Sequence, residues 1–413
     1  MTETDICIIG AGPAGMMASI AAARRAKKVV VIESNTSAGR KLLLTGGGRC
    51  NLTHTGSADE IIRAYKPFDR FVRHCIYEFG PQKLRDFFRN HGLETVVEQS
   101  GCVFPETQNA GDIQQILFDE MKKLNIRIFY DKKVVSVKLF SPDTCGRGLF
   151  IIESEKSVIS AKCLIIATGG VSWPQTGSTG DGYKFAQKLG HKIIKPIAVV
   201  VPLVTAEKFC SSLAGISVKN VSITSKINGK KISSSGPMLF THKGIGGPAV
   251  FDMSRNIADL PKGNIKIFID FLPDIKTNEL DKTIITANPR QNIISVLSQL
   301  LPKALIKTIC AENNIPEIGA GQINKKLRKT LVEKLKTFPL SIVSAEPVEK
   351  ATATRGGVDT AEIDSKTMQS KLCHGLFFAG ETVNVDGPCG GYNLQFAFSS
   401  GVLAGKSAAL LLE

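Results

Sequence analysis

The chain has 413 residues, of which 43% are hydrophobic and 22% are charged, a composition typical of a folded globular protein with more than one domain. No apolar run approaches the roughly 18 residues that a membrane helix needs, and Asp5 stands where a signal peptide would need its apolar region. We therefore expect a cytoplasmic protein that makes no membrane contact.

The ten cysteines show no CxxC pair and no Cys/His cluster with the spacing of metal ligands. We expect neither a disulfide framework nor a metal site. Lysine and arginine outnumber aspartate and glutamate by 15. This charge favours an anionic partner, for which nucleic acid, a membrane surface and a phosphorylated cofactor are all candidates.

The first motif lies in "DICIIGAGPAGMMASIAAARRAKKVVVIE", residues 5–33, which predicts a strand, a tight turn, a helix and a second strand. Gly10, Gly12 and Gly15 form G-x-G-x-x-G in that context. The three glycines are expected to permit the turn, the approach of a pyrophosphate, and the close packing of the helix on the strand, in that order. The helix N-terminus then directs unpaired N–H groups and its positive dipole end at the phosphates.

Glu33 closes the second strand, 23 residues after Gly10. A carboxylate at this position can accept hydrogen bonds from both ribose hydroxyls of an adenosine and would repel a 2′-phosphate. The strand, helix, strand and terminal acid together predict a unit that binds FAD or NAD.

Two later segments favour FAD. "KCLIIATGGVSWP", residues 162–174, predicts an apolar strand that ends in Ala167-Thr168-Gly169, after two alternating β-type stretches that form a β-meander. "GLFFAGETVNVDGPCGGYNLQFAFSSGVLAG", residues 375–405, predicts a strand followed by a glycine-rich turn into a helix. Many FAD proteins with the glutathione-reductase-like fold are built in this way. A helix that begins near Gly391 would stabilise the negative charge of a reduced flavin.

A run of three glycines follows the first motif, in "LLLTGGGRCNLTH", residues 42–54. It has three interpretations: a linker, a phosphate cradle, or a catalytic loop with Cys50 as nucleophile. Its place just after the Glu33 strand favours a backbone surface for the phosphate-to-flavin part of FAD, with Arg49 and Asn51 as polar contacts.

With these motifs, the sequence resembles the BaiN and aminoacetone-oxidase-like (YhiN-like) family of NAD(P)/FAD-dependent oxidoreductases. The matching segments include "GRKLLLTGGGRCNLTH", "ATGGVSWPQTGSTGDGYKFAQKLGH" and "LFFAGETVNVDGPCGGYNLQFAFSSG", and they cover nearly the whole chain. The resemblance implies an α/β fold, in which a glutathione-reductase-like FAD-binding Rossmann domain carries an inserted β-barrel-like domain and a small helical domain. It also implies that Val134 places its backbone at the adenine. The residues expected to bind FAD are Gly10, Gly12, Pro13, Ala14, Gly15, Glu33, Arg40, Lys41, Thr45, Gly46, Gly47, Gly48, Arg49, Asn51, Val134, Ala167, Thr168, Gly169, Gly380, Glu381, Asp386, Gly391, Asn393 and Leu394.

The FAD-binding segments lie at both ends of the chain, so the middle must be an insertion. We expect residues 1–194 and 346–413 to form the FAD-binding domain, residues 195–275 a β-barrel-like domain, and residues 276–345 a helical subdomain. The inserted part holds no second dinucleotide motif. Either NADH or NADPH therefore docks without a Rossmann domain of its own, or a substrate reduces FAD directly.

Three residues are weak catalytic candidates. His242, in "LFTHKGIGG", lies in a family-like motif of the inserted region and could act as an acid, although a structural histidine is the more common case. Arg49 would favour a thiolate at Cys50, but there is no partner cysteine in CxxC spacing, so a packing role is favoured. Arg49 itself could bind a carboxylate or the pyrophosphate.

The most basic run, "NKKLRKTLVEKLK", residues 324–336, predicts an amphipathic helix whose lysine face is solvated. RNA binding is the alternative, although no aromatic residues are interleaved for base stacking. The leading interpretation is thus an FAD-dependent oxidoreductase of a small organic substrate, with NAD(P)H as donor or O2 as acceptor and without stable nucleic-acid binding. The alternatives are an FAD-dependent RNA-modifying enzyme and a non-catalytic flavin redox sensor.

Overall fold

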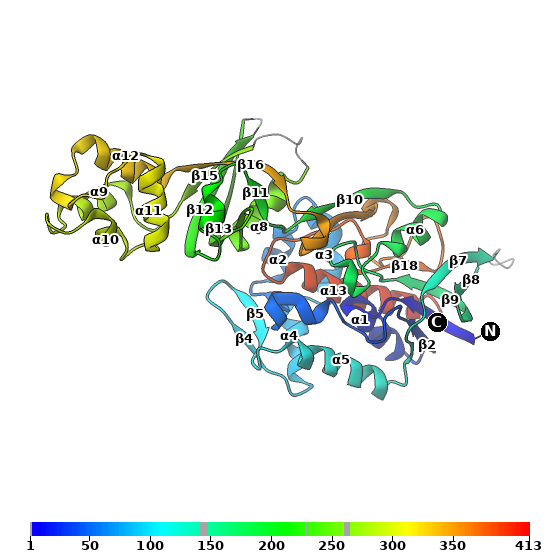
Figure 1. Ribbon diagram of the computed structural model, residues 1–413. Coiled ribbons are helices and arrows are strands. Elements are labelled where there is room, and N and C mark those ends of the chain that lie inside the picture. The colour runs from blue at the N-terminus through cyan, green and yellow to red at the C-terminus, as the bar shows by residue number, and fades with distance from the viewer. Residues whose placement is uncertain (1, 141–147, 228, 260–264) are drawn as a thin grey trace. The chain divides into compact units, whose positions relative to one another are not determined.

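A computed structural model describes residues 2–140, 148–227, 229–259 and 265–413 of the chain (Figure 1). The chain divides into two compact units, one formed by residues 1–197 with 352–413 and the other by residues 198–351. Among the described residues, no helix has both the length and the apolar character that crossing a membrane requires.

Unit 1 is built on a mixed sheet with strand order β6-β2-β1-β9-β8-β7, and β18 pairs with the other edge of β9. Strands β6, β2, β1, β9 and β18 run parallel to one another, whereas β7 and β8 add an antiparallel meander. This is the Rossmann-type α/β fold expected from the sequence. The strands are β1 (Thr2–Ile9), β2 (Val29–Ile32), β6 (Arg127–Phe129), β7 (Val134–Phe140), β8 (Leu149–Ser154), β9 (Ser157–Ile166) and β18 (Leu376–Phe378).

Strand β9 belongs to two parts of the sheet. Its first residues pair with β8 in the meander, and its last residues, Leu164 to Ile166, lie between β1 and β18. One continuous strand therefore joins the meander to the parallel sheet, where two segments were expected.

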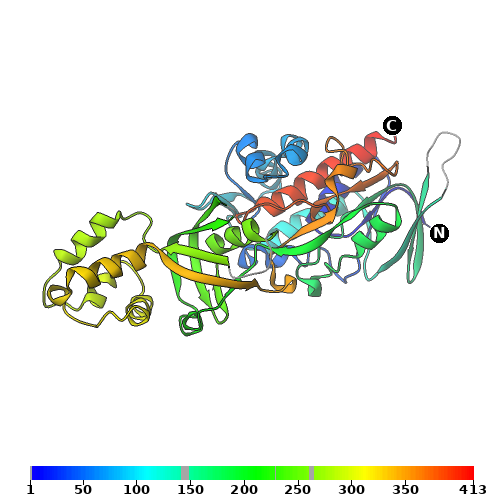
Figure 2. The same cartoon turned by 90° about the horizontal axis from the view of Figure 1, so that it is seen from above.

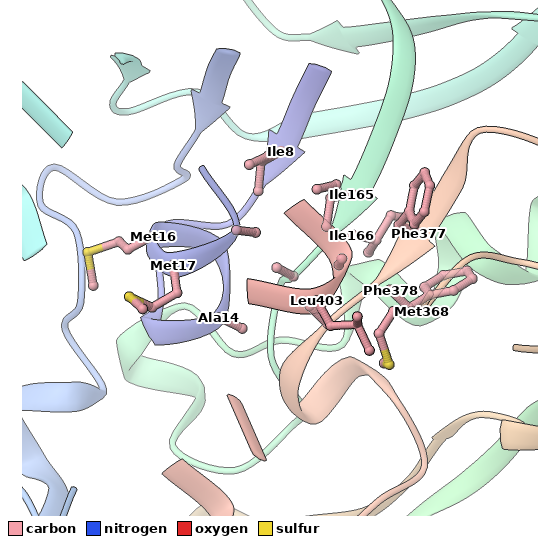
Figure 3. Packing of buried hydrophobic residues seen from close by; sticks show 14 of the residues in the cluster. Ile8, Ala14, Met16, Met17, Ile165, Ile166, Met368, Phe377, Phe378 and Leu403 are labelled. Atoms are coloured by element: carbon pink, nitrogen blue, oxygen red, sulfur yellow. The ribbon is translucent and has the colours of Figure 1, made fainter. Parts of the chain in front are cut away.

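Two helices pack tightly against each other on this sheet, α1 (Pro13–Ala23) and α13 (Tyr392–Leu410). A Cβ atom on Gly401 would lie 2.3 Å from the Ala14 carbonyl oxygen, and one on Gly405 would lie 2.1 Å from that of Ala18. Small residues on both helices thus let the backbones touch. Figure 3 shows side chains of α1, β9, β18 and α13 in the core that forms around this contact.

The rest of unit 1 surrounds this core. A small antiparallel sheet has the order β3-β5-β4, and β10 pairs with β17 where the chain leaves and re-enters the unit. The remaining elements are β3 (Thr53–His54), β4 (Thr95–Val97), β5 (Cys102–Pro105), β10 (Ile193–Val199), β17 (Ala353–Val358), α2 (Ala58–Ala64), α3 (Asp69–Glu78), α4 (Pro81–Arg89), α5 (Ala110–Lys123) and α6 (Asp181–Lys188).

Unit 2 contains a closed barrel with the order β11-β14-β13-β12-β15-β16 and a group of helices that shares its core (Figures 1 and 2). Strand β16 (Phe338–Ala345) closes the barrel by pairing with β11 and β15, although these residues were expected in the helical subdomain. This pairing is distant in sequence, so no local pattern marks it. The other elements are β11 (Leu203–Thr205), β12 (Ser217–Ile227), β13 (Lys230–Thr241), β14 (Gly244–Gly246), β15 (Ile265–Asp270), α7 (Phe209–Ser212), α8 (Pro248–Ile257), α9 (Thr277–Ile285), α10 (Ile293–Leu297), α11 (Lys303–Glu312) and α12 (Lys325–Lys336).

Candidate functional site

The turn between β1 and α1 combines a crowded glycine and an open one. A Cβ atom on Gly15 would lie 1.9 Å from the Gly10 carbonyl oxygen, so only glycine lets α1 approach the strand this closely. A Cβ on Gly12 would meet no atom within 4 Å. Gly12 precedes α1, and no side chain caps this helix. The turn therefore presents free space next to unpaired N–H groups, which suits a phosphate.

Glu33 lies beside this turn and is buried. Its Oε2 accepts a hydrogen bond from the Ala11 backbone N–H at 2.8 Å, and its Oε1 accepts from the Asn35 N–H and side-chain amide. The carboxylate thus ties the first turn to the end of β2. Arg40 extends this group because its Nη1 donates to Asn35 Oδ1 at 2.7 Å.

The end of β9 meets the same turn. A Cβ on Gly10, which has φ +102°, would lie 2.5 Å from the Ala167 carbonyl oxygen and 3.1 Å from the Thr168 Cα. The Ala167 N–H in turn donates to the Ile9 carbonyl. The first and second predicted FAD segments are therefore in direct contact. Val134, the predicted adenine position, is buried at the start of β7.

A partly buried ion pair joins these segments to the C-terminal one. Lys41 Nζ lies 2.6 Å from Glu381 Oε2 and also donates to Ser172 Oγ. The Glu381 carboxylate accepts from the Thr354 N–H at 2.6 Å and from the Gly170 N–H at 3.3 Å. The Glu381 carboxylate therefore joins three other chain segments to its own, in addition to any contact with a cofactor.

The three-glycine loop forms an irregular 3-10 segment, Leu42–Gly48, in which Leu42 is buried and the three glycines are exposed. Gly46, Gly47 and Gly48 all have positive φ, and a Cβ on Gly47 would meet no atom within 4 Å. Thr45 is not free, since its hydroxyl donates to the Leu42 carbonyl. This backbone is held in a shape that side chains disfavour, and it leaves open space beside Gly47.

Arg49 and Cys50, which follow the glycines, have different surroundings. The Arg49 guanidinium lies over the Phe104 ring, 4.0 Å from its centroid, and pairs with Glu98 at 2.7 Å. Cys50 has no exposed surface, and burial raises the pKa of its thiol to about 12. A thiolate at Cys50 is therefore disfavoured near neutral pH, which agrees with a packing role.

The loop then reaches the N-terminus of α13. Gly391, with φ +95°, precedes this helix, and a Cβ there would lie 2.4 Å from the Thr53 carbonyl oxygen. In the amide orientation that satisfies both of its polar atoms, Asn51 accepts from the Gly391 N–H at 3.2 Å and donates to the Thr53 carbonyl. The His54 ring stacks on Tyr392 with 5.0 Å between centroids.

Two predicted contacts on the C-terminal segment are occupied by the protein itself. The Asn393 side chain accepts from the Gly387 N–H and donates to the Gly387 carbonyl, so it shapes the loop before the helix. Asp386 is fully buried and pairs with Arg355 at 2.8 Å. The N-cap residue of α13, Gly391, has no side chain with which to cap the helix, and the backbone N–H groups at its start, including those of Asn393 and Leu394, are the donors suited to an anion.

His242, the remaining catalytic candidate, is exposed in the turn between β13 and β14 of unit 2. Within the described ranges, no group of three or more His, Cys, Asp or Glu side chains could hold a metal ion.

Sequence reasoning missed Ser172 and Thr354, which complete the Glu381 network, and Arg355, which neutralises Asp386. Ser172 lies inside the matching segment that begins "ATGGVSWP", and Thr354 and Arg355 lie in "ATRGG", residues 353–357, which also matches the family pattern. The motifs marked these stretches as important without showing which groups they contact.

Comparisons with known proteins show the family of the chain. The family model "HI0933-like protein Rossmann domain" matches residues 4–407. The chain is 32% identical to a "Ribosomal RNA dihydrouridine synthase" of Escherichia coli, over 97% of this chain and 96% of that protein. It is 30% identical to a "3-dehydro-bile acid delta(4,6)-reductase" of Clostridium scindens, over 98% of both.

Solved structures show the same fold at low identity. A 3-ketosteroid delta1-dehydrogenase from Sterolibacterium denitrificans matches with a TM-score of 0.53 and 10% identity, over 99% of this chain and 100% of that one. The chain belongs to the HI0933-like family of FAD-dependent oxidoreductases.

Proposed function

We propose that this protein is an FAD-dependent reductase that uses NADH or NADPH to saturate a carbon–carbon double bond conjugated with a carbonyl group, and that its substrate is a uracil base in ribosomal RNA. One observation supports the FAD-dependent redox activity. Unit 1 brings together the open space at Gly12, the Lys41–Glu381 ion pair and the start of α13, whose N-cap is a glycine.

The names of the two relatives describe one kind of chemistry. A dihydrouridine synthase removes the C5=C6 double bond of uracil, which is conjugated with the C4 carbonyl. A delta(4,6)-reductase of a 3-dehydro bile acid removes a double bond conjugated with the C3 carbonyl. In both reactions a hydride adds to the carbon distant from the carbonyl, and a proton adds to the carbon next to it. FAD, when bound, supplies this hydride after NAD(P)H has reduced it.

The residues of unit 1 fit the parts of FAD. The N–H groups at the start of α1 and the space above Gly12 suit the pyrophosphate, and the Glu33 carboxylate suits the adenosine ribose. The backbone of Thr45 to Asn51, with its three glycines of positive φ, would lie next to the flavin. The backbone N–H groups at the start of α13 would stabilise the negative charge of a reduced flavin bound there.

One observation favours RNA over a small molecule. The chain carries a net charge of +15, which a small neutral substrate does not require. The relative named for ribosomal RNA and the bile-acid relative both align over nearly the full length of this chain and of their own, so the extent of alignment does not separate the two substrates. The second candidate is a small conjugated ketone, which the name of the bile-acid relative supports.

Anaerobic spectroscopy separates these candidates. The holoprotein is reduced with NADH or NADPH until the flavin absorbance is bleached, and is then mixed with either ribosomal RNA or a conjugated steroid ketone. We expect RNA to restore the flavin absorbance. Recovery with the ketone alone would select the second candidate, and failure of both donors to bleach the flavin would reject an NAD(P)H-dependent reductase.

A further inference from the structure

The positive charge of the chain is concentrated in unit 2. Residues 198–351 hold 21 lysines and arginines against 12 aspartates and glutamates, so they carry +9 of the total +15 in 154 of the 413 residues. The predicted FAD contacts all lie in unit 1, so they do not require an excess of positive side chains in unit 2. The excess therefore calls for a separate explanation.

Helix α12 shows where part of this charge is used in folding. Its apolar side chains Leu331, Val332 and Leu335 are buried in the core of unit 2. Two of its cations are held by acids of the same unit: Arg328 pairs with Asp281 at 2.7 Å, and Lys336 pairs with Asp270 at 2.6 Å. The three buried apolar residues and these two paired cations therefore hold α12 in unit 2.

The first turns of α12 show the opposite pattern. Lys325, Lys326 and Lys329 are exposed, and none of them forms an ion pair with any residue that the structure describes. The first turn contains no acidic residue, and the only acid in the helix sequence is Glu333, one turn after Lys329. Lys325 and Lys326 lie in the first turn of α12, where a cation opposes the helix dipole, and Lys329 gains no ion pair from any described residue. Folding thus does not explain them.

RNA is the anionic partner that this face fits. Binding to a bilayer surface requires apolar side chains on the exposed part of the helix, but those of α12 are buried in the core. The helix contains no aromatic residue, so it is suited to phosphates rather than to stacked bases. We infer that Lys325, Lys326 and Lys329 form a docking surface for the phosphate backbone of the RNA substrate. This inference rests on the proposed RNA substrate and adds to it the place where the RNA is held.

The test compares two holoprotein variants of equal charge. In the first, Lys325→Gln, Lys326→Gln and Lys329→Gln are combined. In the control, Lys122→Gln, Lys123→Gln and Lys188→Gln remove three exposed lysines from α5 and α6 of unit 1, which also lack ion pairs among the described residues. The affinity for labelled poly(U) and for transcribed ribosomal RNA is measured from low to moderate salt.

Each lost phosphate contact lowers the slope of log affinity against log salt by about 0.7 to 0.9. The α12 variant should therefore lose about 2 to 3 from the slope, while the control variant keeps the wild-type slope. Both should keep the wild-type flavin absorbance and melting temperature. A variant with arginine at the three α12 positions should bind as tightly as the wild type, because phosphate contacts depend on charge.

Equal RNA affinity in the wild type and the α12 variant would overturn the docking surface, and so would binding of the wild type to phosphatidylserine vesicles but not to RNA. Failure of the proposed function gives a different result. If RNA does not reoxidise the reduced flavin although α12-dependent binding is observed, the docking surface stands and the RNA-reductase activity is rejected.

Discussion

The contrast between Gly12 and Gly15 gives a prediction that separates cofactor binding from folding. Both glycines belong to the same turn, and an alanine at each adds one methyl group. At Gly12 the added Cβ meets no protein atom within 4 Å, and the backbone has φ −77° and ψ −178°, which alanine adopts easily. At Gly15 the added Cβ would lie 1.9 Å from the Gly10 oxygen.

The expected magnitudes follow from these contacts. Gly12→Ala should leave the free energy of unfolding of the apoprotein unchanged or raise it by up to about 1 kcal/mol, because alanine has less freedom in the unfolded chain. It should weaken FAD binding by at least about tenfold, or about 1.4 kcal/mol, because the methyl group fills the space meant for the pyrophosphate. Gly15→Ala should destabilise the apoprotein by about 1 to 3 kcal/mol, because α1 must move away from β1.

The assay measures both quantities on the same preparations. Unfolding of the apoprotein by urea gives the stability, and quenching of flavin fluorescence on titration gives the FAD affinity. The Gly15 variant serves as the control for general damage to the turn. The assignment of the Gly12 space to FAD is refuted if Gly12→Ala binds FAD as tightly as the wild type while remaining fully folded.

Three further predictions concern single side chains. Glu381→Gln removes the charge that pairs with Lys41, so we expect a loss of about 1.5 to 3 kcal/mol in urea unfolding together with weaker FAD retention on gel filtration; an unchanged midpoint would contradict the clamp. Cys50→Ser should keep NAD(P)H-dependent turnover within about threefold in a steady-state assay, because a thiol with a pKa of about 12 is not an active thiolate, and a complete loss with FAD still bound would restore Cys50 as catalytic. For Glu120, burial raises the carboxyl pKa, but hydrogen bonds from Arg24 and His91 outweigh burial and leave the pKa lowered. The stabilisation that the Glu120 carboxylate provides should be present above pH 4.5 and lost as the pH falls through the lower folded pKa, so Glu120→Gln should flatten the acid limb of a plot of melting temperature against pH.

The sequence was sufficient for the parts of the fold that depend on local patterns. The Rossmann-type α/β fold is confirmed, because the glycines of residues 10–15 and the strand that ends at Glu33 mark a unit in which strand, turn and helix are contiguous. Strand β16 could not be assigned in this way. Its residues follow a helix directly, and they join the barrel only through partners far away in the sequence.

At the candidate site, contacts between segments could be predicted from motifs, whereas side-chain ion pairs could not. Motifs indicated which segments should meet, and the structure brings Gly10 against Ala167, and Gly391 against Thr53. The motifs did not reveal that Lys41 and Asp386 are neutralised by Glu381 and Arg355. A side-chain partner in another segment is set by three-dimensional packing, and a single sequence contains no spacing that encodes it. Direct contact of the predicted residues with FAD stays a prediction.

The proposed reduction of a uracil double bond in RNA is tested most directly by incubating the holoprotein with NADPH and ribosomal RNA that lacks dihydrouridine, followed by nuclease digestion and mass spectrometry of the nucleosides. We expect a uridine that gains the mass of two hydrogen atoms, in an amount that matches the NADPH consumed. NADPH oxidation with no change in any uridine would show that RNA is not the substrate.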